Sequence, residues 1–428
     1  MIRDDRPKFK IESTGAKITP RAGLVLVERL AQALGVPHLL DWGLGHLKQR
    51  KRGYRVSQKV LDLVRLYVAG GEALSDLAKL RNDEVMKEFL GQKALLGCST
   101  AVEFLSQLDA GDVEHLSHVA GKVIADTLRL NYNKVATLDV DATFIEAHKC
   151  EAKMSFHGEP GYYPMLGFVA ETQGLLLAEF RDGNCSPASG ALSFLKRLVE
   201  RLSETVEKVR LRSDSAWFNV DVLDFCMENS IEFAITADKN IHMLQTIEAI
   251  GAGGWEQFAD DPNEQIAESV YSFNRGKYAY RIIILRRPMR QLEMFSGIFE
   301  YRVVITNMDW DKRRLIMWHR ERAQSENWIK ELKSGFSLKH PPSGKFYSNA
   351  ACLQIIALAY NLICALKILS LPVSFRPFTI KTLRFRLIHI AGLWVRHARR
   401  WILKLSAPAQ LIALFKSILR RPLKLCQT

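Results

Sequence analysis

The sequence predicts an α/β protein in which a mixed sheet flanked by helices lies between two helical regions. Residues 134–236 alternate between short aliphatic or β-branched runs and segments with apolar residues every three to four positions, which indicates strands and helices in turn. Residues 19–130 show only the helical period. Residues 238–300 contain paired strand-like runs, which predict a β-rich insertion.

Length and composition place the chain among folded globular proteins. At 428 residues the chain is too long to form only one small core. Its content of 48% hydrophobic and 9% aromatic residues excludes a disordered chain. Seven scattered cysteines without a C-x-x-C pair argue against a disulfide framework or a zinc site and for a reducing compartment. The first residues lack the apolar core of a secretory signal. The apolar run 353–366 contains Gln354, Tyr360 and Asn361, which favours a buried helix over a membrane span.

Charge is distributed unevenly along the chain. No Asp or Glu follows Glu331, and the 16 Lys and Arg residues beyond it exceed the net charge of +14, so residues 1–331 are close to neutral. A solvated surface normally mixes both signs, whereas one-sided charge interleaved with apolar residues favours a polyanion partner. We therefore expect this acid-free tail to bind nucleic acid, with an anionic membrane surface as the alternative.

The first region, residues 1–133, is predicted to be helical and to bind DNA. Apolar residues recur at three-to-four spacing in "AGLVLVERLAQAL", "SQKVLDLVRLYVAG", "ALSDLAKLR" and "AVEFLSQL". The basic block "LKQRKRGYR", from Leu47 to Arg55, lies between two of these segments. Short helices with a basic connection suit a helix-turn-helix-like DNA reader. A plain helical bundle with a basic loop explains the pattern equally well.

The second region, residues 134–237, opens with a strand that holds two acids. In "TLDVDATFIEA" the side chains of Asp139 and Asp141 point to the same face, because strand side chains alternate with a period of two. Like charges repel, and a buried unpaired carboxylate is costly, so a functional pair needs a partner such as a metal ion. An edge strand with one wet face is the alternative.

The order of elements after this strand indicates the kind of core. A hairpin turning at Gln173-Gly174, a helix, a strand, a second helix and a last strand give βββαβαβ, the order of a ribonuclease-H-like core. The β-rich insertion, residues 238–300, includes a hairpin turning at 274–276. Residues 301–371 are expected to form the second part of the core. Residues 372–428 are expected to form a basic helical region for DNA contact or dimerisation.

Two more segments contribute candidate site residues. Asp214 ends a strand directly before a turn, where capping the following helix is the alternative role. The predicted helix from about Lys312 to Lys333 ends near Gly335, a stop signal. Its side chains on one face are those of His319, Arg322, Glu326 and Lys333. An exposed face with intrahelical ion pairs is the alternative for this pattern.

Three carboxylates from distant segments can converge on one site for hard cations. Asp141, Asp214 and Glu326 offer the oxygen ligands that Mg²⁺ prefers. Two such ions stabilise the attacking and leaving oxygens of an in-line phosphoryl displacement. Arg322 and Lys333, on either side of Glu326, would then contact the backbone of a nucleic acid, Arg as a planar fork and Lys as a point charge.

The segments "LDVDATFIEAH", "LRSDSAWF" and "HRERAQSENWIKELK" together resemble the DDE transposases of bacterial insertion sequences, of the IS4-like group and the IS1380 type. The last segment resembles that group's Y-x2-R-x3-E-x6-K signature, with Arg322, Glu326 and Lys333 in register. His319 stands where the signature has tyrosine, which puts the role of that position in doubt. The resemblance covers most of the chain.

The resemblance implies that Asp141, Asp214 and Glu326 are the catalytic metal ligands. Asp139 would support them or be the ligand in place of Asp141. DNA contacts are implied for Arg322, Lys333, His319 and Trp255. Trp255 lies in the insertion and would stack on a flipped base at the transposon end, with a core tryptophan of a small β domain as the alternative.

The implied function is cut-and-paste transposition, in which the protein binds the inverted-repeat ends of an insertion sequence, cuts them and joins them to target DNA. The expected cofactor is Mg²⁺, with Mn²⁺ as a substitute and two ions per site. The expected partners are double-stranded DNA and a second copy of the chain in a synaptic homodimer, without a membrane, in the bacterial cytoplasm at the nucleoid. The alternatives are a ribonuclease-H-fold nuclease without strand transfer and a catalytically silent regulator that binds transposon ends.

Overall fold

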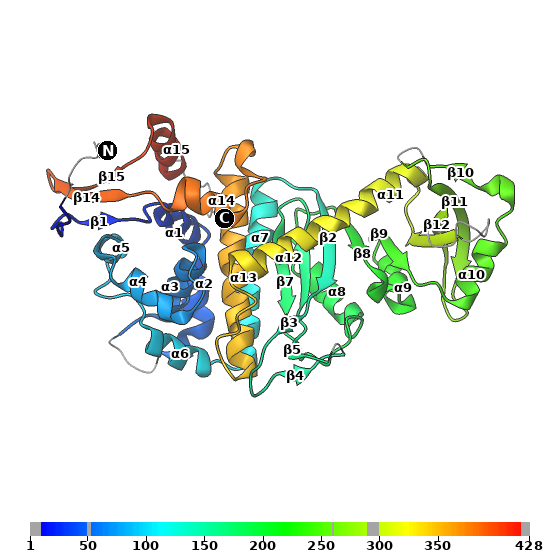
Figure 1. Cartoon of the computed structure of the whole chain (residues 1–428), viewed down its shortest axis with the longest axis horizontal. Coiled ribbons are helices and arrows are strands. Elements are labelled where there is room, and N and C mark those ends of the chain that lie inside the picture. The colour runs from blue at the N-terminus through cyan, green and yellow to red at the C-terminus, as the bar shows by residue number, and fades with distance from the viewer. Residues whose placement is uncertain (1–9, 49–52, 157, 259–260, 289–298, 421–428) are drawn as a thin grey trace, which may run out of the picture.

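The computed structural model of this chain describes residues 10–48, 53–156, 158–258, 261–288 and 299–420. Three parts follow one another along the long axis of Figure 1: a group of N-terminal helices, two long central helices, and a large sheet crossed by a further helical segment. The central helices are α7 (Ala110–Leu130) and α13 (Phe346–Leu369).

The N-terminal region is helical in its described residues, with one two-residue strand, β1 (Ile18–Thr19). Its remaining helices are α1 (Leu24–Ala33), α2 (Val36–Leu44), α3 (Val56–Val68), α4 (Leu77–Arg81), α5 (Glu84–Leu90) and α6 (Cys98–Ser106). The apolar positions of the predicted segments face a shared core, and Leu26, Leu30 and Val60 are fully or almost fully buried there. Residues 49–52, the centre of the basic block, lie outside the described residues, so the predicted DNA reader stays a prediction.

The sheet has nine strands. In spatial order they are β10 (Glu256–Gln257), β11 (Gln265–Ser272), β12 (Ala279–Pro288), β13 (Phe299–Thr306), β9 (Glu232–Ala237), β8 (Lys208–Ser213), β2 (Val135–Ala142), β6 (Met165–Val169) and β7 (Gly174–Glu179). Strands β2, β8 and β9 run parallel, and the other pairs are antiparallel. The helices between them are α8 (Ala191–Glu200), α9 (Val220–Glu228) and α10 (Ile241–Glu248).

The strand with the two acids lies inside the sheet, with strands on both sides, which corrects the edge-strand alternative. β2 pairs with β8 on one side and β6 on the other. Thr137 and Asp139 are buried, and Asp141 at the end of the strand is partly exposed. The aliphatic and β-branched residues of β2 therefore fill a two-sided core, and its acids occupy positions that water does not reach freely.

The predicted insertion continues the central sheet. β11 and β12 form the expected hairpin, and β13 joins that hairpin to β9 through antiparallel pairs such as Val304↔Thr236. Residues 289–298 lie outside the described residues. In Figure 1 this end of the sheet extends away from the central helices. The strand alternation was visible in the sequence, but the pairing partner of β13 was not, because register depends on contacts between distant strands.

Helix α13 is the buried helix that the sequence predicted. By length and composition it could cross a membrane, yet 89% of its most apolar window is buried inside the protein. Its polar residues bind neighbouring backbone: Asn361 accepts a hydrogen bond from the Leu175 amide at 2.8 Å and donates to the Ala120 carbonyl at 2.8 Å. Gln354 donates to the Ala178 carbonyl at 2.9 Å. These bonds satisfy the polar groups that burial would otherwise leave unpaired.

The C-terminal region was predicted to be helical, and this is wrong for residues 392–405. They form a hairpin of β14 (Gly392–His397) and β15 (Arg400–Leu405) that pairs with β1. The turn residues Ala398 and Arg399 have φ of 47° and 63°. Such a turn usually contains Asn or Gly, so its sequence carried no turn signal. The described helices of this region are α14 (Ile380–Leu383), a π-helical turn (Arg384–Ile388) and α15 (Ala409–Arg420).

Candidate metal centre

Asp141 and Asp214 lie at one edge of the sheet because the strands that carry them are parallel neighbours. Asp141 is near the end of β2, and Asp214 follows the last residue of β8. Both line a cavity of about 460 Å³. Asp214 also accepts a hydrogen bond from the Ala216 amide at 3.1 Å, so the capping role considered for it is present together with its place in the cavity wall.

Glu326 is outside the described wall of this cavity, and its charge acts on Asp141. The predicted helix is two helices, α11 (Lys312–Arg320) and α12 (Gln324–Gly335), joined by a 3-10 turn, Glu321–Ala323. They run almost in line across the sheet in Figure 1. Glu326 is exposed in the first turn of α12, a helix that packs against β2.

The charges of the three acids act on one another. Burial raises the pKa of Asp141, the neighbouring carboxylates of Asp214 and Glu326 also raise it, and Arg322 opposes them, which together bring this pKa to about 6. Mutual repulsion of this kind is relieved when a cation binds between the carboxylates. No thiol or imidazole lines the described wall of the cavity, so its donor chemistry fits Mg²⁺ or Mn²⁺ and not a soft metal.

Arg322 and Lys333 both point toward the strand that carries Asp141. Nη1 of Arg322 lies 3.6 Å from Oδ2 of Asp141, and Lys333 donates a hydrogen bond to the Phe144 carbonyl at 2.8 Å. Burial lowers the pKa of Lys333, and the charge of Asp141 counteracts this. The two cations therefore lie beside the carboxylates and are not spread along an exposed helix face.

The other two residues predicted to contact DNA, His319 and Trp255, lie in different parts of the structure. His319 is half-buried, with Nε2 3.4 Å from both the Thr236 hydroxyl and the Ser213 carbonyl, and burial lowers its pKa to about 4. Trp255 precedes β10, and four strands separate β10 from β8. One face of its ring is covered by the Arg286 guanidinium, 3.9 Å from the ring centroid. His319 therefore adjoins the residue that precedes Asp214, whereas Trp255 lies next to the strand at the far edge of the sheet.

Asp139 is held by an arginine that the sequence analysis did not select. It is fully buried, and its two oxygens accept hydrogen bonds of 2.7 Å from Nε and Nη2 of Arg212 on β8. Burial raises the pKa of Asp139 to about 6 while the Arg212 fork opposes that shift, so this carboxylate is ionised at neutral pH. Both oxygens are occupied by the guanidinium.

The cavity wall also contains a third aspartate and a tyrosine that the sequence analysis missed. Asp238 follows β9, the third parallel strand, so the rule that parallel strands end at one edge could have found it. Tyr163 lies between β5 (Pro160–Tyr162) and β6, and no sequence signal marks it. Burial raises the pKa of its phenol, and the charge of Asp141 adds to the shift.

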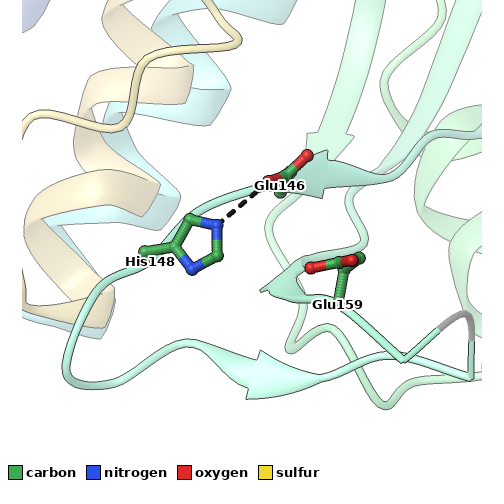
Figure 2. A group of neighbouring side chains, drawn as sticks. All are labelled: Glu146, His148 and Glu159. Carbon is green, nitrogen blue, oxygen red and sulfur yellow. Dashed lines mark hydrogen bonds and ion pairs between the residues drawn. The ribbon is translucent and has the colours of Figure 1, made fainter.

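A second group of possible metal ligands is distinct from this centre. Glu146, His148 and Glu159 are exposed, and one ligand atom from each lies within 4.8 Å of the others (Figure 2). Nε2 of His148 is 3.0 Å from Oε1 of Glu146. Two of them belong to or adjoin the small sheet of β3 (Ile145–Glu146), β5 and β4 (Lys153–Met154). An exposed ion pair with a neighbouring acid accounts for this arrangement.

The raised pKa of Asp141 predicts how stability depends on pH without metal. The folded protein keeps a proton on Asp141 up to about pH 6, whereas an unfolded chain releases it near pH 4. The folded state thus binds more protons in this interval, so the free energy of unfolding should fall by about 2 kcal/mol between pH 4 and pH 6. Urea unfolding in chelator should show this fall in wild type and a shallower one in Asp141→Asn. Parallel curves for the two proteins would contradict it.

A family model and a solved structure are similar to this chain. A solved structure titled "Cryo-EM structure of piggyBac transposase synaptic complex with hairpin DNA (SNHP)" is similar at a TM-score of 0.43 and 10% identity, over 95% of this chain and 87% of that one. A search of curated proteins gave no match. The family model described as "Transposase DDE domain group 1" matches residues 2–426. The chain therefore belongs to the DDE transposase family.

Proposed function

We propose that this protein is a cut-and-paste transposase of a bacterial insertion sequence, of the IS4-like group and IS1380 type, acting in the cytoplasm at the nucleoid. It would bind the inverted-repeat ends, cut them with divalent metal ions and transfer them to target DNA. The observation that carries the proposal is the cavity shared by Asp141 and Asp214, with Glu326 close enough to raise the pKa of Asp141. The strand order β7-β6-β2-β8-β9 supports a ribonuclease-H-like core around it.

Each residue of the centre has a distinct task in this proposal. Asp141, Asp214 and Glu326 would hold the metal ions, which when bound activate the attacking water and stabilise charge on the scissile phosphate. Mg²⁺, or Mn²⁺ in its place, and two ions suit the hard oxygen donors. Arg322 would orient a phosphate oxygen with its planar fork. Tyr163 keeps its proton at neutral pH and can donate a hydrogen bond to the same phosphate.

The test of this function uses radiolabelled DNA that carries the element's inverted repeats and a target plasmid. Cleavage at the ends with Mg²⁺, followed by joining of the 3′-hydroxyl ends to the plasmid, is the expected result. Cleavage without joining would favour the nuclease alternative, and binding without cleavage the silent regulator. Cross-linking on end DNA should also reveal the proposed homodimer.

The hairpin of β14 and β15 is the part of the acid-free tail best suited to contact DNA. Arg396, Arg399 and Arg400 are exposed, and none forms an ion pair with a described residue. Trp401 is 48% exposed and stacks on Trp394, with ring centroids 5.3 Å apart. A rigid, basic and partly aromatic projection is typical of a surface that binds a phosphate backbone.

Replacing the three hairpin arginines by Gln should therefore reduce DNA binding for all sequences alike. The slope of log affinity against log salt concentration should fall by about 0.9 for each lost phosphate contact, or about 2.7 for all three. Fluorescence anisotropy over a salt series measures this slope.

A matched control removes the same charge from paired lysines. Lys134, Lys208 and Lys277 each form an ion pair with a glutamate. The triple Gln variant at these positions should keep the wild-type slope. Equal slopes for the hairpin variant and wild type would assign the hairpin to dimerisation or to a membrane surface instead.

A further inference from the structure

The buried ion pair next to the metal centre connects all three segments that carry its acids. Asp139 and Arg212 are register partners on the parallel strands β2 and β8. Counting two residues onward from this pair on both parallel strands places Asp141 opposite Asp214. Because side chains alternate along a strand, all four side chains belong to one face of the sheet. The ion pair thus holds the two strands together two residues before Asp141 and Asp214.

The same guanidinium also binds the helical junction that leads to Glu326. Nη1 of Arg212 donates to the Trp318 carbonyl at 2.8 Å and to Oε2 of Glu321 at 3.0 Å. Its plane lies over the Trp318 ring, 4.9 Å from the centroid. Because the nitrogens of this planar side chain bind both β2 and the helical junction, it cannot shift toward one without breaking bonds to the other.

These contacts coincide with the break between α11 and α12. The Trp318 carbonyl accepts a hydrogen bond from the Glu321 amide, three residues on, in addition to the one from Arg212. A side chain that occupies a helix carbonyl is a recognised cause of a local change in helix geometry. The tightened turn sets the direction in which α12 leaves the junction, and with it the position of Glu326 five residues after Glu321.

We propose that Arg212 is a positioning residue that sets the spacing of Asp141, Asp214 and Glu326, and that Asp139 serves to hold Arg212 and not to bind metal. This inference rests on the proposed function of the three acids. It explains the second aspartate of the strand: a guanidinium in a dry interior needs a carboxylate partner in fixed geometry.

The main experiment replaces the pair by apolar residues, Asp139→Leu/Arg212→Met. Exchanging a buried ion pair for apolar side chains of similar volume is often neutral or stabilising, so this variant should melt at or above the wild-type temperature. Its affinity for end DNA should be unchanged. Single-turnover cleavage at saturating Mg²⁺ should fall roughly 100-fold, the scale of a small misplacement of reacting groups. Calorimetric titration of the DNA-free protein with Mn²⁺ should show about tenfold weaker binding.

Arg212→Lys provides the conservative comparison, because it keeps a positive charge and loses the planar fork. Its matched control is Arg65→Lys in the N-terminal helices, where a buried guanidinium also lies between two carboxylates, those of Glu28 and Asp62. Both lysine variants should lose stability. Only Arg212→Lys should lose Mn²⁺ affinity and cleavage rate at a temperature where both are folded.

A folded double variant with wild-type cleavage and Mn²⁺ affinity would overturn the inference, as would equal losses in the two lysine variants. A failure of the proposed function looks different: Asp141→Asn would then cut DNA as well as wild type, whatever the Arg212 variants do. If the apolar double variant does not fold, the comparison of Arg212→Lys with Arg65→Lys decides by the same two measurements.

Discussion

The Asp141→Asn variant should bind transposon ends as wild type does and cut them at least about 1000-fold more slowly. The amide keeps the shape of the carboxylate and loses its negative charge, so the cavity at the ends of β2 and β8 should no longer hold its cations. Asp214→Asn and Glu326→Gln should behave alike, because each removes one proposed ligand of the metal ions. Gel shifts with end DNA and single-turnover cleavage with Mg²⁺ measure the two properties separately.

Glu159→Gln is the matched control for these variants. It removes an exposed carboxylate from the Glu146–His148–Glu159 group shown in Figure 2, outside the described cavity wall. Wild-type cleavage is expected from it. Near wild-type cutting by Asp141→Asn, or loss of cutting in the control, would move the catalytic metal away from the cavity.

Alanine at Arg322 or Lys333 should reduce cleavage roughly 100-fold and leave Mn²⁺ binding intact. Neither side chain can hold a metal, since guanidinium and protonated amine offer only donors. Their positions beside Asp141 and the Phe144 carbonyl suit orientation of the scissile phosphate. Arg322→Lys should restore little activity, because the planar fork is lost. Single-turnover cleavage of pre-bound ends at saturating Mg²⁺ is the measurement.

Arg320→Ala supplies the comparison from the same helical segment. Its guanidinium is 2.6 Å from Oε2 of Glu264, away from the carboxylates, so wild-type cleavage is expected. If Arg322 and Lys333 acted only in surface ion pairs, their loss would cost about 0.2–0.5 kcal/mol of stability each and would leave the rate unchanged. Wild-type rates in both alanine variants would remove the phosphate contact from the mechanism.

The strands around the metal centre were predictable because each is a short buried run bounded by turn signals. The strand from Val135 to Ala142 could be predicted from the alternation of its side chains. Asp214 could be selected because it stands at the end of a predicted strand. The partners of those acids were not predictable. Arg212 faces Asp139 through the pairing of strands far apart in the chain, and no single-sequence pattern encodes register.

The errors have similar physical causes. The C-terminal hairpin has Ala398 and Arg399 at its turn, where hairpins usually have Asn or Gly, so the sequence did not indicate the turn. One continuous helix was predicted from about Lys312 to Lys333, and the 3-10 turn Glu321–Ala323 that divides it lies where Arg212 of another strand binds the Trp318 carbonyl. Local propensity described the elements, whereas tertiary contacts set the positions of side chains within the site.

Helix α13 has a consequence for how the molecule can be divided. It packs against α1, α3, α6 and α7 on one side and against β7 of the sheet on the other. Most buried apolar residues from Leu24 to Ile418 form one continuous cluster through it, and a smaller second cluster joins α11 to the strands β9, β11, β12 and β13. The N-terminal helices and most of the sheet therefore share one interior, so we expect them to unfold in one cooperative transition. A fragment that ends before Phe346 should expose apolar surface in both halves and aggregate, so end recognition and cleavage cannot be exchanged between relatives as independent modules.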